Sequence, residues 1–223
     1  MGSIVVLKLV KIKDKKIYLL GLIKGLTSER KVVRSAFTKL KPDAIALYIS
    51  ASEVLGLQSV LDGKTTQVPL SRYEEAYAQK LAYYAKQDPK KYGEVQVPPP
   101  CLMEGLELGI KNKVPVVALD MNDSDYASSY IQNISTVSLL RHSLRFKRLK
   151  KRKFDVSTPE SFTLAWDQEL TKIKGFRTLE TARERHIAKR LLELKDKFDC
   201  ILAILEFERI EGVLNQLKNA KKS

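Results

Sequence analysis

Short apolar runs that end in polar or charged residues alternate with segments of helical periodicity, and this alternation most constrains the fold. The runs DAIALYIS (43–50), VPVVALD (114–120) and DCILAILEF (199–207) are rich in leucine and β-branched residues, which favours buried strands. Helical segments separate them, so the strands are joined by crossovers and lie mostly parallel. The sequence therefore predicts an α/β fold with a central, largely parallel sheet and flanking helices.

The two ends of this pattern differ from its middle. Residues 4–23, IVVLKLVKIKDKKIYLLGLI, indicate two strands around a KDKK turn, an N-terminal β-hairpin. Residues 71–175 are mostly helical and are predicted to form an insertion or cap within a single domain of residues 1–223. Pro159 can open a helix in this region, and Gly175 is predicted to end it. A tyrosine stripe on the helix at 71–87 is predicted to face the core or a partner helix.

Composition narrows the class of protein. Of 223 residues, 44% are hydrophobic and 30% charged, and no apolar run approaches the roughly 20 residues that a membrane span needs. The N-terminus alternates like a strand and lacks a signal-peptide pattern. Cys101 and Cys200 have neither metal-ligand nor redox spacing. These features predict a cytoplasmic protein in a reducing compartment, without a membrane partner.

The charge is strongly basic and unevenly placed. The net charge of +14 arises from 40 basic and 26 acidic residues and suggests a polyanionic partner. The richest stretch is RHSLRFKRLKKRK at 141–153, called the basic segment below, which contains no acidic residue. Its basic residues are Arg141, Arg145, Lys147, Arg148, Lys150, Lys151, Arg152 and Lys153.

The basic segment is predicted to be helical, with a nucleic-acid-binding face. Its four arginines recur at intervals of four, three and four, so they share one side of a helix. Leu140, Leu144 and Leu149 are expected to anchor the helix on another side. Arginine fits phosphate bidentately, and phosphate neutralisation gives salt-dependent binding. RNA or a ribonucleoprotein surface is the first choice of partner and DNA the second. The alternative is an exposed charged helix, or one paired with acids from elsewhere in the fold or from a second subunit.

Polar residues also follow the predicted strands, where α/β proteins build their sites. Lys24, Tyr48, Asp120 and Glu206 stand at four such positions. A second hypothesis is therefore a hydrolase acting on an anionic substrate, with a desolvated Lys24 as base. Asp120, Glu206 and Glu208 could instead bind a hard cation such as magnesium, or pair with Lys24 and Arg209, and pairing is preferred. The sequence has no Gly-rich phosphate loop, and no cofactor is predicted.

Several motifs resemble those of the TraB/PrgY-like superfamily, which includes metallohydrolases. In that family a first strand ends in Gly-Thr-x-His, where this chain has Gly21-Leu22-Ile23-Lys24. A later strand reads proline-aspartate, apolar residues and glutamate, and Tyr48 lies near the glutamate position in PDAIALYIS. An Arg-Asp-x-x-Met-Ala helix is similar to RERHIAKR at 183–190. The family's Gly-x-Gly-His position is filled by Glu206-Phe207-Glu208-Arg209.

The resemblance covers about the first 60 and last 45 residues, a helix near 101–113 and the VPVVALD strand. It implies an α/β fold, but cations and tyrosine replace the family's metal-ligating and catalytic residues. The remaining histidines, His142 and His186, lie on predicted helices and are expected to be surface or packing residues. The resemblance therefore implies a non-catalytic binding protein. A third hypothesis is a self-associating homodimer, formed through the tyrosine helix at 73–84 or the last helix.

Overall fold

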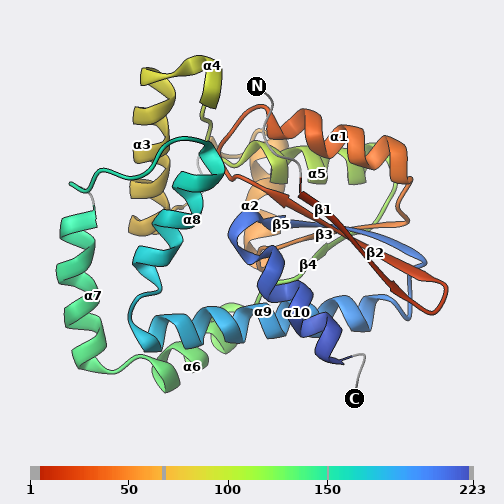
Figure 1. Ribbon diagram of the computed structural model, residues 1–223. Coiled ribbons are helices and arrows are strands. Elements are labelled where there is room, and N and C mark those ends of the chain that lie inside the picture. The colour runs from red at the N-terminus through yellow and green to blue at the C-terminus, as the bar shows by residue number, and fades with distance from the viewer. Residues whose placement is uncertain (1–5, 67–68, 150, 221–223) are drawn as a thin grey trace.

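The computed structural model describes residues 6–66, 69–149 and 151–220, and it confirms an α/β fold with an N-terminal hairpin (Figure 1). The strands are β1 (Val6–Ile12), β2 (Lys15–Leu22), β3 (Ala44–Leu47), β4 (Val116–Ala118) and β5 (Cys200–Glu206). They form one sheet in the order β1-β2-β5-β3-β4. The β1–β2 pair is antiparallel, and the β2–β5, β5–β3 and β3–β4 pairs are parallel.

Helices cover both faces of this sheet. In Figure 1, α1 (Glu29–Leu40) and α5 (Pro100–Asn112) lie above it, and α9 (Lys174–Leu194) and α10 (Ile210–Ala220) lie below. Gly105 lets α5 approach closely, because a Cβ atom there would lie 2.8 Å from the Ile204 side chain. α2 (Ala51–Leu61) packs beside α5. None of the described helices has both the length and the apolar character to cross a membrane.

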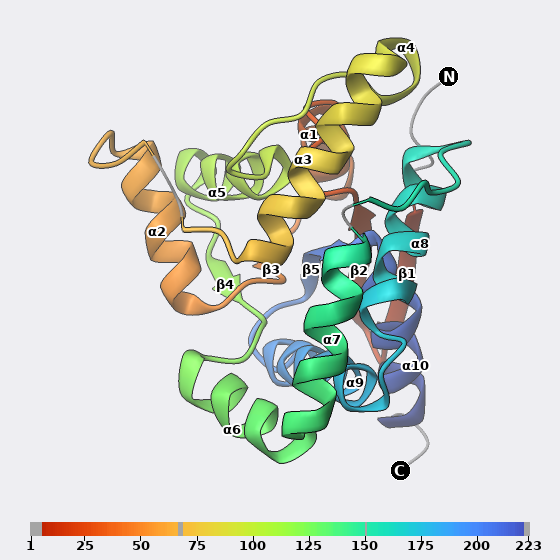
Figure 2. The same ribbon diagram turned by 90° about the vertical axis from the view of Figure 1, so that its left-hand side faces the viewer.

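A helical cap stands beyond the carboxyl ends of the parallel strands. It consists of α3 (Arg72–Gln87), α4 (Pro89–Tyr92), α7 (Thr136–Leu149) and α8 (Pro159–Leu170), seen in Figures 1 and 2. The cap has its own apolar cluster, separate from the core around the sheet. α6 (Asp123–Asn133) lies against α9 below the cap.

The cap is built from two stretches of chain. Between them, α5 and β4 return to the central layers, and β4 pairs with β3. The range 71–175, predicted as one helical insertion, therefore contributes a helix and a strand to the body of the fold. The helices before α5 and those after α6 in this range lie together beyond the carboxyl ends of the parallel strands (Figure 2).

The tyrosine stripe of α3 belongs to the chain's own core. Tyr77 stacks on Phe162 of α8 with ring centroids 5.5 Å apart, and Tyr73 meets Phe146 of α7 at 4.5 Å. The last helix likewise buries its apolar side, with Val213 and Leu217 fully covered. Both faces that the sequence offered for self-association are thus occupied within one chain.

Gly175 does not end a helix, contrary to the prediction. α8 already stops at Leu170, and Gly175 lies in the first turn of α9. A Cβ atom at Gly175 would lie 2.4 Å from the carbonyl oxygen of Asn133, so glycine allows the end of α6 to approach α9 closely.

The two edges of the sheet are different. β4, at one edge, is only three residues long. At the other edge, β2 is the single sheet neighbour of β1 among the described residues. Leu7, Lys8 and Leu9 of β1 are exposed.

Candidate functional site

The parallel topology brings the ends of four strands to one edge of the sheet. Lys24 follows β2, Tyr48 follows β3, Asp120 follows β4, and Glu206 ends β5. All four residues line one cavity of about 550 Å³ between this edge and the cap. This strand-end cavity is therefore the place where the residues singled out from the sequence meet.

Lys24 and Glu206 form an ion pair at the floor of the cavity. Their side chains are 20% and 9% exposed, and Lys24 Nζ lies 2.7 Å from Glu206 Oε1. Burial lowers the pKa of Lys24, but the charges of Glu206 and Glu74 outweigh it and leave this pKa above its usual value. Lys24 therefore keeps its proton at neutral pH, so the geometry does not support it as a general base.

Glu206 shows the opposite balance. Burial raises the pKa of Glu206, but Lys24, Arg183 and Arg209 together hold it at about 2. The carboxylate is thus ionised at neutral pH and closely neutralised. The preferred expectation, that Glu206 pairs with Lys24, agrees with this geometry.

Two arginines complete a network that the sequence did not predict in detail. Arg183 binds Asp120 through two nitrogens, and its Nη1 lies 3.0 Å from Glu180. Arg209 pairs with Asp167 of α8 and lies 3.5 Å from Glu180. Asp120 thus pairs with Arg183 instead of Lys24 or Arg209. Glu180 could have been identified, because it precedes Arg183 by three residues on one helix.

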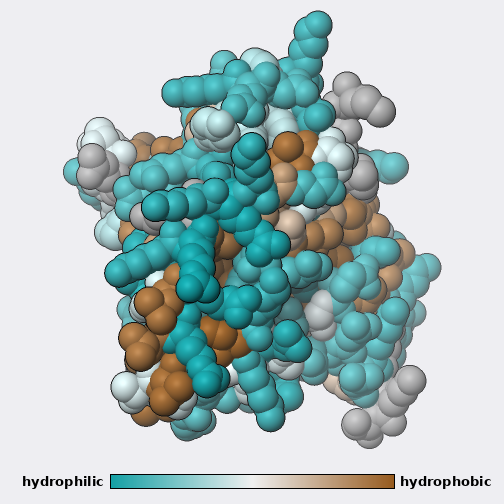
Figure 3. Space-filling view, turned by 60° about the vertical axis from the view of Figure 1, so that its left-hand side comes forward, coloured by the Kyte–Doolittle hydropathy of each residue, from teal (hydrophilic) through white to brown (hydrophobic). Residues whose placement is uncertain are grey.

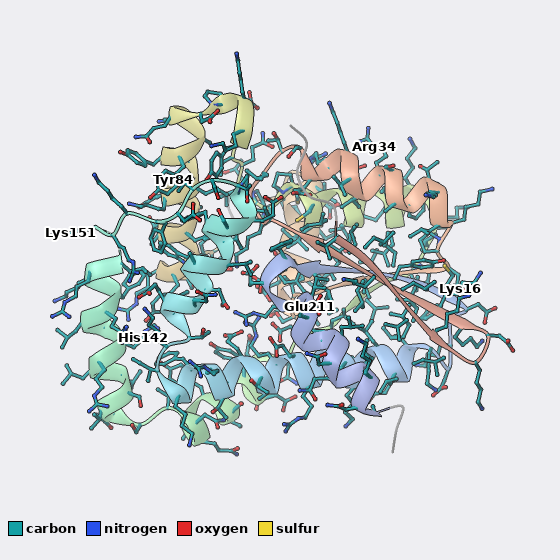
Figure 4. All side chains as sticks on the ribbon, viewed as in Figure 1. Lys16, Arg34, Tyr84, His142, Lys151 and Glu211 are labelled. Atoms are coloured by element: carbon teal, nitrogen blue, oxygen red, sulfur yellow. The ribbon has the colours of Figure 1, made fainter. Side chains whose placement is uncertain are left out.

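The same network bears on the magnesium hypothesis for Asp120, Glu206 and Glu208. Among the described residues, no group of three or more His, Cys, Asp or Glu side chains is arranged to hold a metal ion. Asp120 and Glu206 instead point at cations of the protein. His142 is buried, stacks on Phe176 and hydrogen-bonds the hydroxyl of Tyr73, so it packs as expected (Figure 4).

Two buried polar atoms of the cavity lining, the hydroxyl of Tyr48 and Nε of Arg209, have no hydrogen-bond partner among the described residues. Within the part of the chain that the structure describes, the hydroxyl of Tyr48 is buried and makes no hydrogen bond. Glu208, which is partly buried, has no ion pair within 4 Å there. Burial and the neighbouring Glu206 raise the pKa of Glu208 to about 8. Glu206 and Glu208 therefore form a coupled pair in which one carboxyl is ionised and the other retains a proton near neutral pH.

This proton predicts how stability depends on pH. Unfolded Glu208 loses its proton near its ordinary pKa of 4.5, whereas folded Glu208 holds it up to about 8. Between these values the folded state binds more protons, so the free energy of unfolding falls as pH rises. We expect a decrease of at least about 1.4 kcal/mol between pH 5 and pH 8, which corresponds to one pKa unit.

Urea unfolding at several pH values measures this decrease. Glu208→Gln is expected to remove most of it, and Glu211→Gln, an exposed neighbour outside the cavity, to leave it unchanged. Burial lowers the pKa of His142, which contributes stability in the opposite direction over part of this range, so the variant is compared with the parent. The same dependence of stability on pH in parent and Glu208→Gln would contradict the raised pKa of Glu208.

The basic segment lies on the cap, along the end of α7 and the chain that follows it. Lys151 points away from the molecule in Figure 4. The helix ends at Leu149 instead of continuing to 153, and residues 151–153 follow in a turn and loop. Lys150 lies outside the described residues. The other basic residues are all exposed: Arg141, Arg145, Lys147, Arg148, Lys151, Arg152 and Lys153.

The leucine anchors predicted for this helix are largely wrong. Leu140 and Leu144 are 64% and 50% exposed, and of the three leucines only Leu149 is buried. The helix packs instead through His142 and Phe146, because Tyr73 and Phe176 offer them aromatic partners. The two exposed leucines are therefore apolar side chains on a helix whose basic residues are also exposed. Figure 3 shows hydrophobic surface beside hydrophilic side chains on one face of the molecule.

The basic segment is not wholly without acidic partners. Glu169 of α8 lies 2.8 Å from Arg152 and 3.9 Å from Arg145. Arg141 and Arg148 have no ion pair among the described residues. Of the four arginines on this side of the segment, two are therefore near an acidic side chain, and two have no ion pair with any described residue.

A groove of about 610 Å³ runs between α3 and the loop after α7. Lys80, Lys151 and Lys153 line it together with Tyr83, Tyr84 and Phe154. Tyr83 is 53% exposed, and the Lys80 ammonium lies 5.6 Å from its ring centroid. The tyrosine stripe predicted from the sequence did not include Tyr83, so sequence reasoning missed this exposed ring.

No protein-family model and no curated protein matches this chain. The relation to the TraB/PrgY-like superfamily therefore stays a prediction.

Proposed function

We propose that this protein is a non-catalytic, TraB-like α/β protein that binds a polyanion through the basic segment. The observation that carries the proposal is the exposure of every described basic side chain between 141 and 153, with Glu169 as the nearby acid. Arg141 and Arg148 lie on one side of α7, and neither has an ion pair among the described residues. Guanidinium groups fit phosphate oxygens bidentately and gain affinity through counterion release.

Single-stranded nucleic acid is the polyanion that best suits this surface. The neighbouring groove combines lysines with the exposed ring of Tyr83. Lysines neutralise a phosphate backbone, and an exposed ring lets an unpaired base stack without sequence preference. RNA, alone or in a ribonucleoprotein, is therefore the first choice and DNA the second.

A labelled single-stranded RNA of mixed sequence tests the proposal in a titration by fluorescence anisotropy across a salt series. The affinity of the parent protein is expected to fall steeply with salt. Changing all four arginines of the segment (Arg141, Arg145, Arg148 and Arg152) to alanine should reduce the slope of log K against log salt by up to about 3. No binding at low salt by the parent protein would refute the proposal.

Two double variants sharpen the assignment of the surface. Arg141→Ala/Arg148→Ala removes two charges that have no ion pair with a described residue, whereas Arg145→Ala/Arg152→Ala removes charges that Glu169 already neutralises in part. The first is expected to weaken RNA binding more than the second. Lys31→Ala/Lys39→Ala, on the distant helix α1, is the control that removes two exposed charges and should change little. Equal losses in all three variants would mean that only net charge matters.

The second candidate is an enzyme with an altered site, and one observation favours it. Lys24, Tyr48, Asp120 and Glu206 converge on a cavity instead of filling the space between the strands and the cap. An anionic substrate suits this cavity poorly, because Lys24, Arg183 and Arg209 are already engaged by carboxylates. Hydrolysis of a generic phosphoester such as p-nitrophenyl phosphate, lost in Lys24→Met, would support this candidate over the binding protein.

A further inference from the structure

The strand-end cavity is acidic, although the protein as a whole is strongly basic. Among the described residues that line it, cationic side chains are outnumbered by carboxylates. The cations are Lys24, Arg183 and Arg209, and the acids are Glu53, Glu74, Asp120, Asp123, Asp167, Glu180, Glu206 and Glu208. With Glu208 protonated near neutral pH, the lining still carries seven negative and three positive charges, an excess of four negative charges. Field lines concentrate in such a cleft, so it attracts cations and repels anions.

The cavity also contains two buried polar atoms without a hydrogen-bond partner among the described residues, the Tyr48 hydroxyl and Arg209 Nε. Carboxylates already neutralise the charge of Arg209, because its Nε lies 3.5 Å from Glu180 and 3.9 Å from Glu206. Tyr48 is 6% exposed and lines the cavity, and its hydroxyl has no hydrogen-bond partner within the described chain. Buried hydroxyls are normally satisfied, so an orphaned one facing a cavity indicates a ligand with a matching polar group. Glu208 adds a carboxyl group that has no ion pair with any described residue at the same cavity.

Aromatic rings form other parts of the wall. Tyr73, Tyr77, Tyr126 and Trp166 line the cavity. One cation is already bound in these surroundings. The ammonium of Lys24 lies 5.9 Å from the ring centroid of Tyr77 and forms ion pairs with Glu206 and Glu74. Carboxylates with aromatic faces are the surroundings that organic cations prefer.

We propose that the strand-end cavity binds an organic cation, whose alkyl ammonium group is held by the carboxylate of Glu208 and the hydroxyl of Tyr48. The ammonium donates hydrogen bonds to both oxygens, and the alkyl chain lies along the rings of Tyr77 and Trp166. A small amine and a lysine side chain of a peptide share this chemistry. The site is separate from the basic segment, and its ligand has the opposite charge.

Calorimetric titration of the full chain with 1,4-diaminobutane tests this proposal. At pH 8.5 the diamine keeps its protons and Glu208 is ionised. Saturable binding at one site is expected. Glu208→Gln should weaken it about tenfold or more, because a hydrogen bond to a charged group is lost. Tyr48→Phe should weaken it less. Neither variant should unfold, because neither removes an ion pair with a described residue and Gln can still accept the backbone hydrogen bond made by Glu208.

A matched carboxylate variant separates binding in the cavity from general attraction of a cation to acidic surface groups. Glu211→Gln removes an exposed carboxylate three residues from Glu208 and outside the cavity, and is expected to bind the diamine like the parent. Titration with a trilysine peptide distinguishes a peptide ligand from a small amine. Absence of diamine and peptide binding, or equal affinity in parent and Glu208→Gln, would overturn the proposal. Binding of magnesium or inorganic phosphate in place of the amines would also overturn it.

Discussion

Replacing Lys24 by methionine is expected to lower the free energy of unfolding by about 3–5 kcal/mol at pH 7, because it leaves a buried charge without its partner. Methionine has a similar length but cannot neutralise Glu206, whose side chain is 9% exposed. Arg209 lies 3.9 Å from Glu206 and also serves Asp167, so it compensates only in part.

The loss should depend on pH in one direction. In the parent, the pKa of Glu206 is held at about 2, below its ordinary 4.5. This group therefore contributes stability that is fully present above pH 4.5 and disappears as pH falls through 2. The difference between parent and Lys24→Met should accordingly be largest at neutral pH and shrink near pH 3. Urea unfolding followed by circular dichroism at both pH values measures it.

A double variant separates the stranded charge from lost packing. Lys24→Met/Glu206→Gln removes both charges, and we expect it to recover more than half of the stability that Lys24→Met loses. Lys31→Met, on an exposed part of α1, should behave like the parent. If Lys24→Met unfolds at the same urea concentration as the parent, the ion pair does not carry the energy assigned to it.

Phe162→Ala is expected to be similarly severe, at about 3–5 kcal/mol, because Phe162 is fully buried at the centre of the cap. Its ring packs against those of Tyr77, Tyr84 and Phe154 at centroid distances of 5.3 to 5.5 Å. The surrounding aromatic side chains are themselves packed against one another, so they can fill the space only in part.

The single tryptophan makes this loss observable within the cap. Trp166 lies 6.0 Å from Phe162, so its fluorescence reports on the cap, while circular dichroism reports on the whole chain. In Phe162→Ala the fluorescence change should occur at a lower urea concentration than the change in circular dichroism, since the sheet has a separate core. Leu164→Ala, on the exposed side of α8, is the control. Coincident transitions in Phe162→Ala would mean that cap and sheet unfold as one unit.

The sheet could be predicted from sequence because its signal is local. Each central strand is a continuous apolar run, and both faces of β3 and β5 are indeed buried. Parallel pairing then follows from the intervening helices, and with it the meeting of strand ends at one edge. For this reason the sequence could predict that Lys24, Tyr48 and Glu206 lie close together. The prediction came from the expected sheet topology, because no sequence motif links the three residues.

The packing of the cap could not be predicted in the same way. Leucine is the usual core residue of a helix, so Leu140 and Leu144 were the natural anchors of α7. The helix buries His142 because Phe176, thirty-four residues later, stacks on its ring at 3.7 Å. No periodicity within α7 encodes a partner that lies on α9.

The choice of ion pairs was also beyond sequence reasoning. Eight carboxylates compete for three cations around the cavity, and small shifts of the helices decide which groups meet. Arg183 of α9 pairs with Asp120, which follows β4. This pairing depends on how the whole fold places α9 relative to the end of that strand.

The hairpin strand β1 has a consequence for how copies of the protein meet. A free strand edge offers unpaired peptide groups to any passing chain, and flat apolar edges seed fibrous aggregates. Here the exposed residues of β1 are Leu7, Lys8, Leu9 and Lys11, so the apolar edge is interrupted by two lysines. A second copy that tried to extend the sheet there would bring ammonium groups of both chains together, so electrostatic repulsion makes the edge a poor template for polymerisation.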